Sequence, residues 1–139
     1  MDDAFLSQFT SNFEKYLFIH KTLIKVSGLT SEWYSNNLDY YKEAILYFWY
    51  DSQFNAVYDF WQEQQRQEHT YYDWAKPSLD HIVPKSRGGS NHYTNLQFLT
   101  TFENLAKRDM TQEEWKIFKQ NTHSYSDYYI ESIMEVSIK

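Results

Sequence analysis

Four polar residues in the middle of the chain have types and an order that are suited to phosphodiester hydrolysis. They are Asp80, His81, Asn95 and Asn104, and they lie in the segment from Ser78 to Lys107 of a 139-residue sequence. Hydrolysis of a phosphodiester needs an activated water molecule, stabilisation of the charge that develops at phosphorus, and neutralisation of the departing 3′ oxygen. A carboxylate, an imidazole and two amides are the side chains from which such a site can be built.

Each of the four side chains suits a different part of this chemistry. His81 is the natural general base, because an imidazole titrates near neutral pH and can accept a proton from water. Asp80 is a hard oxygen ligand for Mg²⁺ or Mn²⁺, and the amide oxygen of Asn104 is a candidate second ligand. Asn95 is a candidate to hydrogen-bond the backbone of the loop after His81 and to hold the imidazole in place.

The adjacency of Asp80 and His81 constrains the backbone that carries them. Neighbouring residues of a regular strand point to opposite faces of the sheet. Both side chains can therefore face one cation only where the strand is irregular or ends. We expect that end to lie beneath the helix that carries Asn104.

The pattern around these residues predicts a strand, a loop, a second strand and a helix. Pro84 ends the first strand, residues 87–91 are rich in turn formers, and Thr100 or Thr101 can cap a helix that continues through Lys107. The apolar positions that indicate the strands are Leu79, Ile82 and Val83 for the first and Leu96, Phe98 and Leu99 for the second.

Helices are predicted on both sides of this motif. Apolar residues three or four apart predict helices over 3–26, from about 30 to 50 with an irregularity at Asn36 and Asn37, and from 51 into a polar run that ends at 69. On the other side, a Thr-Gln-Glu-Glu capping box opens a helix over about 111–120, and Ser126 can cap a last one to about Val136. The first seventy residues are thus expected to form a three-helix element.

The resulting fold class is α+β and mostly helical, with a small ββα motif between helical segments. We expect an N-terminal helical element over 1–70, the ββα motif over 71–110 and C-terminal helices over 111–139, all in one compact unit. The composition agrees, because 42% of the residues are hydrophobic and 20% are aromatic, with only 3 glycines and 2 prolines. Such a composition is typical of a folded chain.

The composition also limits the compartment and the cofactors. The sequence has no cysteine, which excludes disulfides and thiolate zinc sites and makes a reducing cytoplasm permissible. We find no apolar run of membrane-spanning length, and the N-terminus lacks the pattern of a signal peptide. We therefore expect a cytoplasmic protein that has no contact with a membrane.

Aromatic residues are concentrated in the first seventy positions, from Trp33 to Trp61. Aromatic rings can stack on nucleic-acid bases, but at helical spacing they more often form a core and the contacts between helices. A homodimer formed through these aromatic helices is a further alternative.

The charge of the chain is distributed unevenly. The net charge is −6, whereas the segment from Lys76 to Lys119 holds seven Lys or Arg and five Asp or Glu. The motif is therefore the basic part of an acidic chain, which is the polarity that phosphate contact requires.

At this level of detail the segment resembles the HNH endonucleases, also called ββα-metal or His-Me finger nucleases. The family pattern D-H-I-x-P-x-S-x-G-G matches residues 80–89, N-L-x-x-L matches 95–99, and C-x-x-C-N-x-x-K aligns with 100–107. The continuation through RDMTQEEW is similar to small HNH proteins of bacteria and phages, some of them homing endonucleases. The resemblance covers less than a quarter of the chain.

The resemblance implies a function and a set of roles. It implies hydrolysis of double-stranded DNA with Mg²⁺ or Mn²⁺, leaving 5′ phosphate and 3′ hydroxyl ends. It assigns His81 as general base, Asp80 and Asn104 as metal ligands, and Asn95 as the residue that orients the loop. The candidate nucleic-acid contacts are the basic residues of the motif, Lys85, Arg87, Lys107 and Arg108.

One departure from the family pattern bears on stability. Thr100 and Glu103 stand where many HNH proteins have cysteines of a structural zinc site. No structural zinc is therefore expected, and the small motif must be held by packing against the helices around it.

Two alternatives remain open at this point. A catalytically spent HNH scaffold could serve as a DNA-binding or protein-interaction module, and the acidic, aromatic flanks favour that alternative. A ribonuclease of the same fold would use the same chemistry at phosphorus. The biological use of a DNA endonuclease could be homing, restriction or phage DNA processing.

Overall fold

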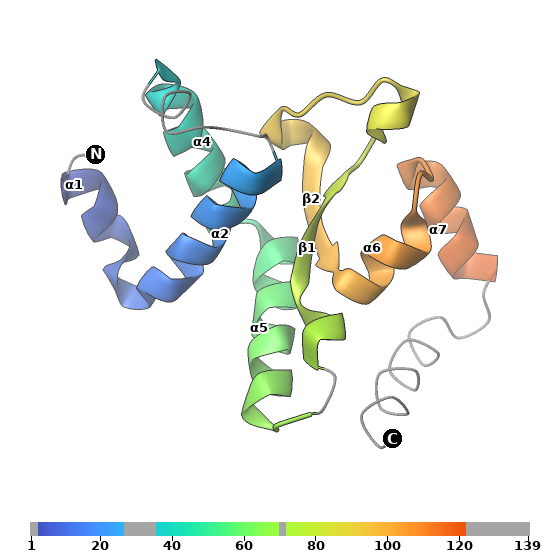
Figure 1. Cartoon of the computed structure of the whole chain (residues 1–139), viewed down its shortest axis with the longest axis horizontal. Coiled ribbons are helices and arrows are strands. Elements are labelled where there is room, and N and C mark those ends of the chain that lie inside the picture. Colours follow the sequence, from blue (N-terminus) through green and yellow to red (C-terminus); the bar gives the residue numbers. More distant parts are fainter. Residues whose placement is uncertain (1–2, 27–35, 70–71, 122–139) are drawn as a thin grey trace. The chain divides into compact units, whose positions relative to one another are not determined.

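The computed structural model describes residues 3–26, 36–69 and 72–121 (Figure 1). The chain divides into two compact units, Met1–Asp51 and Ser52–Lys139, which are described separately below. The boundary lies after Asp51, whereas the sequence predicted it near residue 70. The difference concerns helix α5 (Ser52–Arg66), which packs on the strands of the second unit.

The first unit is helical. The helix predicted over 3–26 is interrupted by a 3-10 segment, where hydroxyl side chains bond to the backbone: Oγ of Ser7 donates to the carbonyl of Ala4 (2.8 Å), and Oγ1 of Thr10 donates to that of Ser7 (3.1 Å). Such local bonds compete with the α-helical pattern. The predicted helix start near 30 lies outside the described residues. The elements are α1 (Asp3–Leu6), η1 (Ser7–Asn12), α2 (Phe13–Val26) and α4 (Leu38–Trp49).

Aromatic side chains form the core of the first unit. Phe9 is fully buried, stacks on Tyr16 with ring centroids 4.9 Å apart, and meets Trp49 edge-on at 4.9 Å. In the aromatic-rich stretch itself, Tyr41 is 2% and Phe48 0% exposed, so the interpretation of that stretch as core is confirmed for these two rings. Tyr50 differs, because 75% of it is exposed.

A chain of polar contacts runs through this aromatic core. The hydroxyls of Tyr16 and Tyr41 lie 2.7 Å apart, and the Tyr41 hydroxyl lies 2.5 Å from Nδ1 of His20. Burial lowers the pKa of His20 below its ordinary value, and the positive charge of Lys21 lowers it further. Burial also raises the pKa of Tyr16, against the opposing effect of its bond to Tyr41. The neutral forms of these groups are thus favoured in the fold.

We expect the stability of the chain to fall as the pH drops below the ordinary histidine pKa of about 6.5. Because the pKa of His20 is lower in the fold, the unfolded chain binds the proton more readily. The contribution of neutral His20 to the free energy of unfolding is therefore fully present above pH about 6.5, and it is lost as the pH falls toward the pKa of His20 in the folded protein. Thermal melts of wild type and His20→Gln at pH 7.5 and 5.5 test this expectation. The variant should lose less stability on acidification, and an identical loss in both proteins would contradict the assignment.

The second unit is built around a two-stranded antiparallel sheet (Figure 1). Asp80 pairs with Gln97 and His81 with Leu96 across the two strands. A mostly helical α+β fold and the strand, loop, strand, helix order are therefore confirmed. The elements are α5, η2 (Tyr72–Ala75), β1 (Pro77–His81), η3 (Lys85–Arg87), η4 (Tyr93–Asn95), β2 (Leu96–Thr100), α6 (Thr101–Lys107) and α7 (Gln112–Asn121).

The first strand lies earlier in the chain than predicted. It begins at Pro77 and ends at His81, so Ile82 and Val83 lie outside it. Ile82 still donates its N–H to the carbonyl of Asn95 (2.8 Å), but the N–H of Val83 bonds to the Asn95 side chain instead of a strand partner. That side chain is what ends the ladder.

Both helices after the sheet begin at the predicted caps. Thr100 Oγ1 accepts a hydrogen bond from the N–H of Glu103 (3.1 Å), and Glu103 Oε1 accepts one from the N–H of Thr100 (3.4 Å). Thr111 and Glu114 repeat this capping box at the start of α7. The last predicted helix, over 126–136, lies outside the described residues.

Packing between β2 and the helices closes the core of the second unit. Phe98 of β2 is fully buried, and its ring centroid lies 4.6 Å from that of Phe54 on α5. Trp115 of α7 is 1% exposed. Within the ranges that the structure describes, no helix is both long and apolar enough to cross a membrane.

Candidate active site

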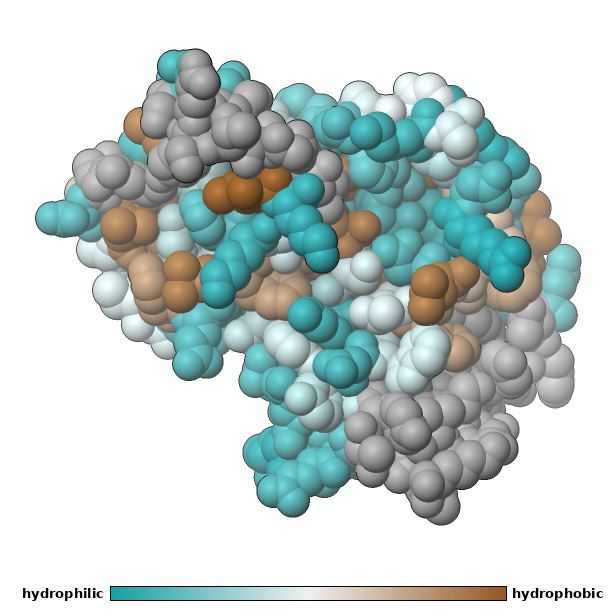
Figure 2. Space-filling model, viewed as in Figure 1, coloured by the Kyte–Doolittle hydropathy of each residue, from teal (hydrophilic) through white to brown (hydrophobic). Residues whose placement is uncertain are grey.

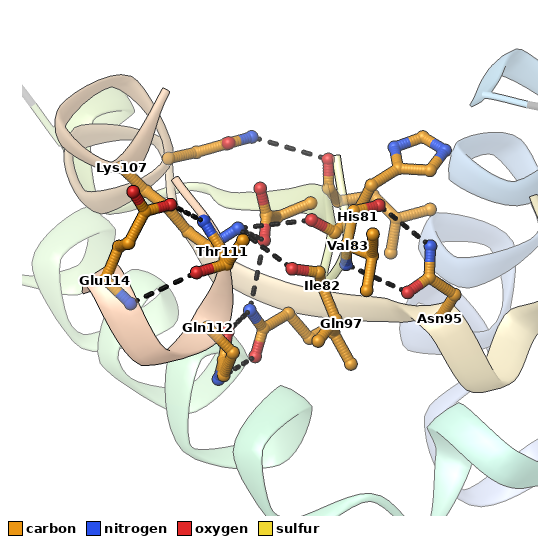
Figure 3. A network of polar contacts seen from close by, with 12 residues as sticks. His81, Ile82, Val83, Asn95, Gln97, Lys107, Thr111, Gln112 and Glu114 are labelled. Atoms are coloured by element: carbon orange, nitrogen blue, oxygen red, sulfur yellow. Dashed lines mark hydrogen bonds and ion pairs between the residues drawn. The ribbon is translucent and has the colours of Figure 1, made fainter. Parts of the chain in front are cut away.

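The loop between the two strands is folded around the side chain of Asn95. Its amide oxygen accepts a hydrogen bond from the N–H of Val83 (2.9 Å), and its amide nitrogen donates to the carbonyls of Val83 (3.0 Å) and Ser90 (2.8 Å). Figure 3 shows the Asn95 amide facing Val83. Asn95 thus makes the loop contacts expected of it, although it lies in η4, immediately before the second strand.

The same loop has room for only a glycine at position 89. A Cβ atom on Gly89 would lie 1.7 Å from the carbonyl oxygen of Val83 and 2.9 Å from Nδ2 of Asn95. These two atoms are hydrogen-bonded to each other, so neither can give way without opening the loop. Gly88 needs a glycine for another reason, because its φ is +89° although the space around it is open.

Gly89→Ala is therefore expected to lower the free energy of unfolding by about 1–3 kcal/mol through steric overlap. Gly88→Ala is the matched control, with a cost of about 1 kcal/mol from its left-handed backbone conformation alone. Chemical denaturation measures both values. Only Gly89→Ala should also disturb the loop that follows His81, so equal destabilisation by the two substitutions would contradict this account.

His81 is the last residue of β1 and is half-buried. Its Nε2 atom lies 2.8 Å from the amide oxygen of Asn91. Because that oxygen can only accept, the neutral ring carries its proton on Nε2 and keeps a lone pair on Nδ1. Among the described residues Nδ1 has no hydrogen-bond partner. Asn91 thus contacts the imidazole directly, while Asn95 bonds the backbone of the loop that follows it.

Asp80 lies one residue earlier on β1 and is 6% exposed. Its Oδ2 atom accepts a hydrogen bond from Nε2 of Gln97 (3.0 Å) and lies 2.9 Å from Nζ of Lys107. Both contacts use the same oxygen. In the described part of the chain, Oδ1 has no partner. One carboxylate oxygen is therefore anchored and the other is available to a ligand.

Neutral amides support this anchor from two helices, and Figure 3 shows the contact between Gln97 and Gln112. Gln97 donates from Nε2 to Oε1 of Gln112 on α7 (2.9 Å), and its own Oε1 accepts from Nε2 of Gln53 on α5 (3.1 Å). Gln53 also donates to the carbonyl of Phe98 (2.9 Å). The position of Asp80 is thus tied to α5 and to α7.

Asn104 extends from α6 toward β1. Its Nδ2 donates to Oγ of Ser78 (2.7 Å) and, more weakly, to the carbonyl of Leu79 (3.4 Å). The amide oxygen has no hydrogen-bond partner among the residues that the structure describes. The helix that carries Asn104 therefore lies against the strand that carries Asp80, as predicted.

A pocket of about 290 Å³ brings three of the four predicted residues together, while Asn95 lies outside it. Asp80, His81 and Asn104 contribute to its wall. The surface over the neighbouring β1–β2 loop is mostly hydrophilic (Figure 2). The lining residues are Leu79, Asp80, His81, Pro84, Lys85, Asn104, Arg108 and Asp109. The pocket is thus suited to a polar, charged ligand.

Two of the four predicted basic contacts line this pocket. Lys85 and Arg108 are exposed and lie at its wall. Arg87 instead pairs with Glu114, at 2.5 Å from Nη1 to Oε1. The pKa of Glu114 lies below its ordinary value, first because the backbone N–H of Thr111 donates to it and then because of Arg87. Arg87 is therefore engaged in an ion pair on the surface.

The prediction that Lys107 contacts nucleic acid does not agree with its position in the structure. Its side chain is 0% exposed, and Nζ lies 2.9 Å from Oδ2 of Asp80 and donates to the carbonyls of His81 (3.1 Å) and Ile82 (3.5 Å). A burial this complete is incompatible with the predicted contact between Lys107 and a phosphate in this conformation. The cause is the buried carboxylate, which needs a partner charge.

The oxygen donors at the pocket fit a divalent cation of the Mg²⁺ type. Within the described residues no three His, Cys, Asp or Glu side chains form a metal-binding group. A cation here would be held by Oδ1 of Asp80 and the amide oxygen of Asn104, with water or phosphate oxygens at the other positions. Hard oxygen ligands with several retained waters are what Mg²⁺ prefers.

Three residues of the site escaped the sequence analysis. Asn91 lies in the turn-rich loop, where an asparagine is ordinarily a turn former, and Asp109 follows the predicted helix without a distinguishing pattern. Gln97 carried the clearest signal, because it is a polar residue among the apolar positions of the second predicted strand, and the structure shows that it is buried there. A buried amide usually has hydrogen-bond partners, and here they lead to Asp80.

Comparison with known proteins adds no family to this geometry. No family model matches the chain, no curated protein matches it, and no solved structure matches it. A function for the chain must therefore be argued from the site.

Proposed function

We propose that this protein is a divalent-metal-dependent endonuclease of the HNH type, which hydrolyses phosphodiester bonds of double-stranded DNA. The observation that supports the proposal best is the pocket that Asp80, His81 and Asn104 share. It combines a candidate base with two oxygen donors at one polar opening. The expected products carry 5′ phosphate and 3′ hydroxyl ends.

In the proposed reaction His81 removes a proton from the attacking water. Its Nδ1 lone pair is available, and the bond from Nε2 to Asn91 fixes the ring in the tautomer that leaves it so. A general base contributes about 10²–10⁴-fold to such a step. The imidazole can then return the proton to solvent.

Asp80 and Asn104 would hold Mg²⁺ or Mn²⁺, which as a Lewis acid supplies charge neutralisation at the phosphate and the leaving oxygen. Lys85 and Arg108, on the wall of the pocket, would bind the flanking phosphates of the nucleic acid. With one such site, each encounter cuts one strand, so cleavage of both strands needs a second protomer or a second visit.

A second function has a specific observation in its favour. Asp80 is nearly buried and already paired with Lys107, as a structural carboxylate would be. A catalytically spent scaffold that binds DNA or another protein would retain this pair. Oδ1 of Asp80 and Nδ1 of His81, which have no partner among the described residues, favour the enzyme.

The proposal is tested by incubating the purified protein with supercoiled plasmid and Mg²⁺ or Mn²⁺. We expect nicked or linear products, and we expect excess EDTA to stop their formation because the charge at phosphorus is then not neutralised. Mapping the cut ends identifies the end chemistry and any sequence preference. Cleavage of RNA alone would point to the ribonuclease alternative, and inactivity on plasmid, phage DNA and RNA would favour the spent scaffold.

A further inference from the structure

Lys107 is an unusual residue for the edge of a cation site. Its ammonium group is fully buried and lies 2.9 Å from Asp80, and its other acceptors are the backbone carbonyls of His81 and Ile82. Lysine is rarely buried unless it is paired. The charge of the carboxylate that would bind a metal is thus already balanced from inside the protein.

The surroundings add to this positive charge. Lys85, Arg108 and Asp109 also line the pocket, so its wall holds two basic and two acidic residues besides His81. With the buried lysine behind Asp80, the site carries a net positive charge. A divalent cation that enters it meets the carboxylate of Asp80, whose charge Lys107 already balances, and the neutral amide of Asn104. Coulomb repulsion from the basic groups opposes binding of the cation.

We propose that Lys107 is an internal counter-ion of Asp80 that makes cation binding depend on a nucleic-acid phosphate. The inference rests on the proposed nuclease function and adds an order of events to it. The phosphodiester supplies both the missing negative charge and further oxygen ligands. Free protein therefore binds the cation weakly, and DNA and cation strengthen each other's binding by the same factor.

The wild-type chain tests this coupling directly. Mn²⁺ binding is measured by the loss of the free-ion electron paramagnetic resonance signal, with protein alone, duplex alone and both together. A brief incubation, or the His81→Ala variant, keeps the duplex intact. We expect the duplex to tighten Mn²⁺ binding at the protein site about tenfold or more. Equal Mn²⁺ affinity with and without duplex overturns the inference.

The reciprocal measurement provides an independent value. The anisotropy of a labelled duplex gives its affinity for the protein with and without Mn²⁺. The two coupling factors must agree, because linkage between binding equilibria is symmetric. A strengthening of DNA binding that is much smaller than that of Mn²⁺ binding overturns the inference, since the additional Mn²⁺ then lies elsewhere.

Replacement of the lysine tests its role. Lys107→Gln removes the charge but keeps a donor for Asp80, so Mn²⁺ binding to the free protein should tighten about tenfold and the effect of the duplex should shrink. Lys116→Gln is the matched control, since it makes the same change of net charge at an exposed position of α7. If Lys107→Gln is folded and binds Mn²⁺ as weakly as wild type does, the lysine is not the counter-ion. If Lys107→Gln does not fold, the Mn²⁺ affinities of the wild-type chain with and without duplex still test the inference.

The outcomes separate this inference from the function on which it rests. DNA cleavage together with tight Mn²⁺ binding in the absence of duplex would support the nuclease function and contradict the dependence of cation binding on DNA. If the protein neither cleaves DNA nor binds Mn²⁺, with or without duplex, both the nuclease function and the coupling are contradicted. Cleavage with coupled binding that Lys107→Gln weakens supports both.

Discussion

Replacement of His81 by alanine is expected to lower the rate of DNA cleavage by about 10²–10⁴-fold while DNA binding is retained. The ring supplies the only proton acceptor that the proposed reaction uses. Its Nε2 is bonded to Asn91, and its Nδ1 has no hydrogen-bond partner within the described ranges. In the proposed function the contacts to phosphate come from other residues. The measurement compares initial rates of plasmid nicking with Mn²⁺ and the anisotropy of a labelled duplex.

Two further variants serve as controls for this result. His92 is an exposed loop histidine whose Nδ1 bonds to Thr94, so His92→Ala should cleave at close to the wild-type rate. Asn91→Leu keeps the imidazole but removes the acceptor of its Nε2–H group. This variant should lower the rate of DNA cleavage by about 10–100-fold and leave DNA affinity unchanged. If His81→Ala retains the full rate, the base lies elsewhere.

Removal of either member of the Asp80–Lys107 pair is expected to destabilise the fold by about 3–5 kcal/mol. Asp80→Ala leaves a fully buried ammonium without its counter-charge, and Lys107→Met leaves a nearly buried carboxylate in the same state. An exposed carboxylate that served only as a metal ligand would have almost no such effect. Guanidinium denaturation of the metal-free protein gives the values.

The double variant Asp80→Leu with Lys107→Met provides the sharper comparison. With both charges absent, much of the loss should be recovered, because buried ion pairs can be replaced by apolar residues at little cost. Lys116→Met, on the exposed face of α7, should change stability by no more than about 0.5 kcal/mol. A double variant as unstable as the two losses combined would show that the charges do not interact.

Local signals made the elements around the site predictable. The helix caps at Thr100 and Thr111 follow from short-range chemistry that the sequence states directly. Thr111 was predicted as a cap, and Thr100 was one of the two candidates for the other. The interrupted helix near Ser7 and the early end of β1 were missed, because competing hydroxyl bonds decide the first and the contacts of Asn95 decide the second. The assignment of α5 to the second unit depends on packing with β2, which no local pattern records.

The candidate site was predictable in its members but not in its electrostatics. The order of Asp80, His81 and Asn104 was sufficient to group them, and the pocket brings them together. The burial of Lys107 was not predictable, because a lysine near a phosphate-binding motif is ordinarily exposed and only the fold brings it to Asp80. The orienting role of Asn91 depends in the same way on the path of the loop.

The capping box of Thr100 and Glu103 occupies the positions where the proposed family has zinc cysteines. It joins the end of β2 to the start of α6 through hydrogen bonds alone. Removal of metal ions should therefore leave this junction intact, so a chelator can be used to stop the reaction without unfolding the protein.

The burial of Lys107 and the pairing of Arg87 have a consequence for ionic strength. Of the four basic residues of the motif, only Lys85 and Arg108 line the pocket wall from exposed positions. For DNA bound at this pocket, few condensed counterions would be released. Because each neutralised phosphate contributes a slope of about −0.9 in a plot of log affinity against log salt concentration, the slope should be near −2. DNA binding by this acidic chain should thus be less sensitive to salt than its count of motif lysines and arginines suggests.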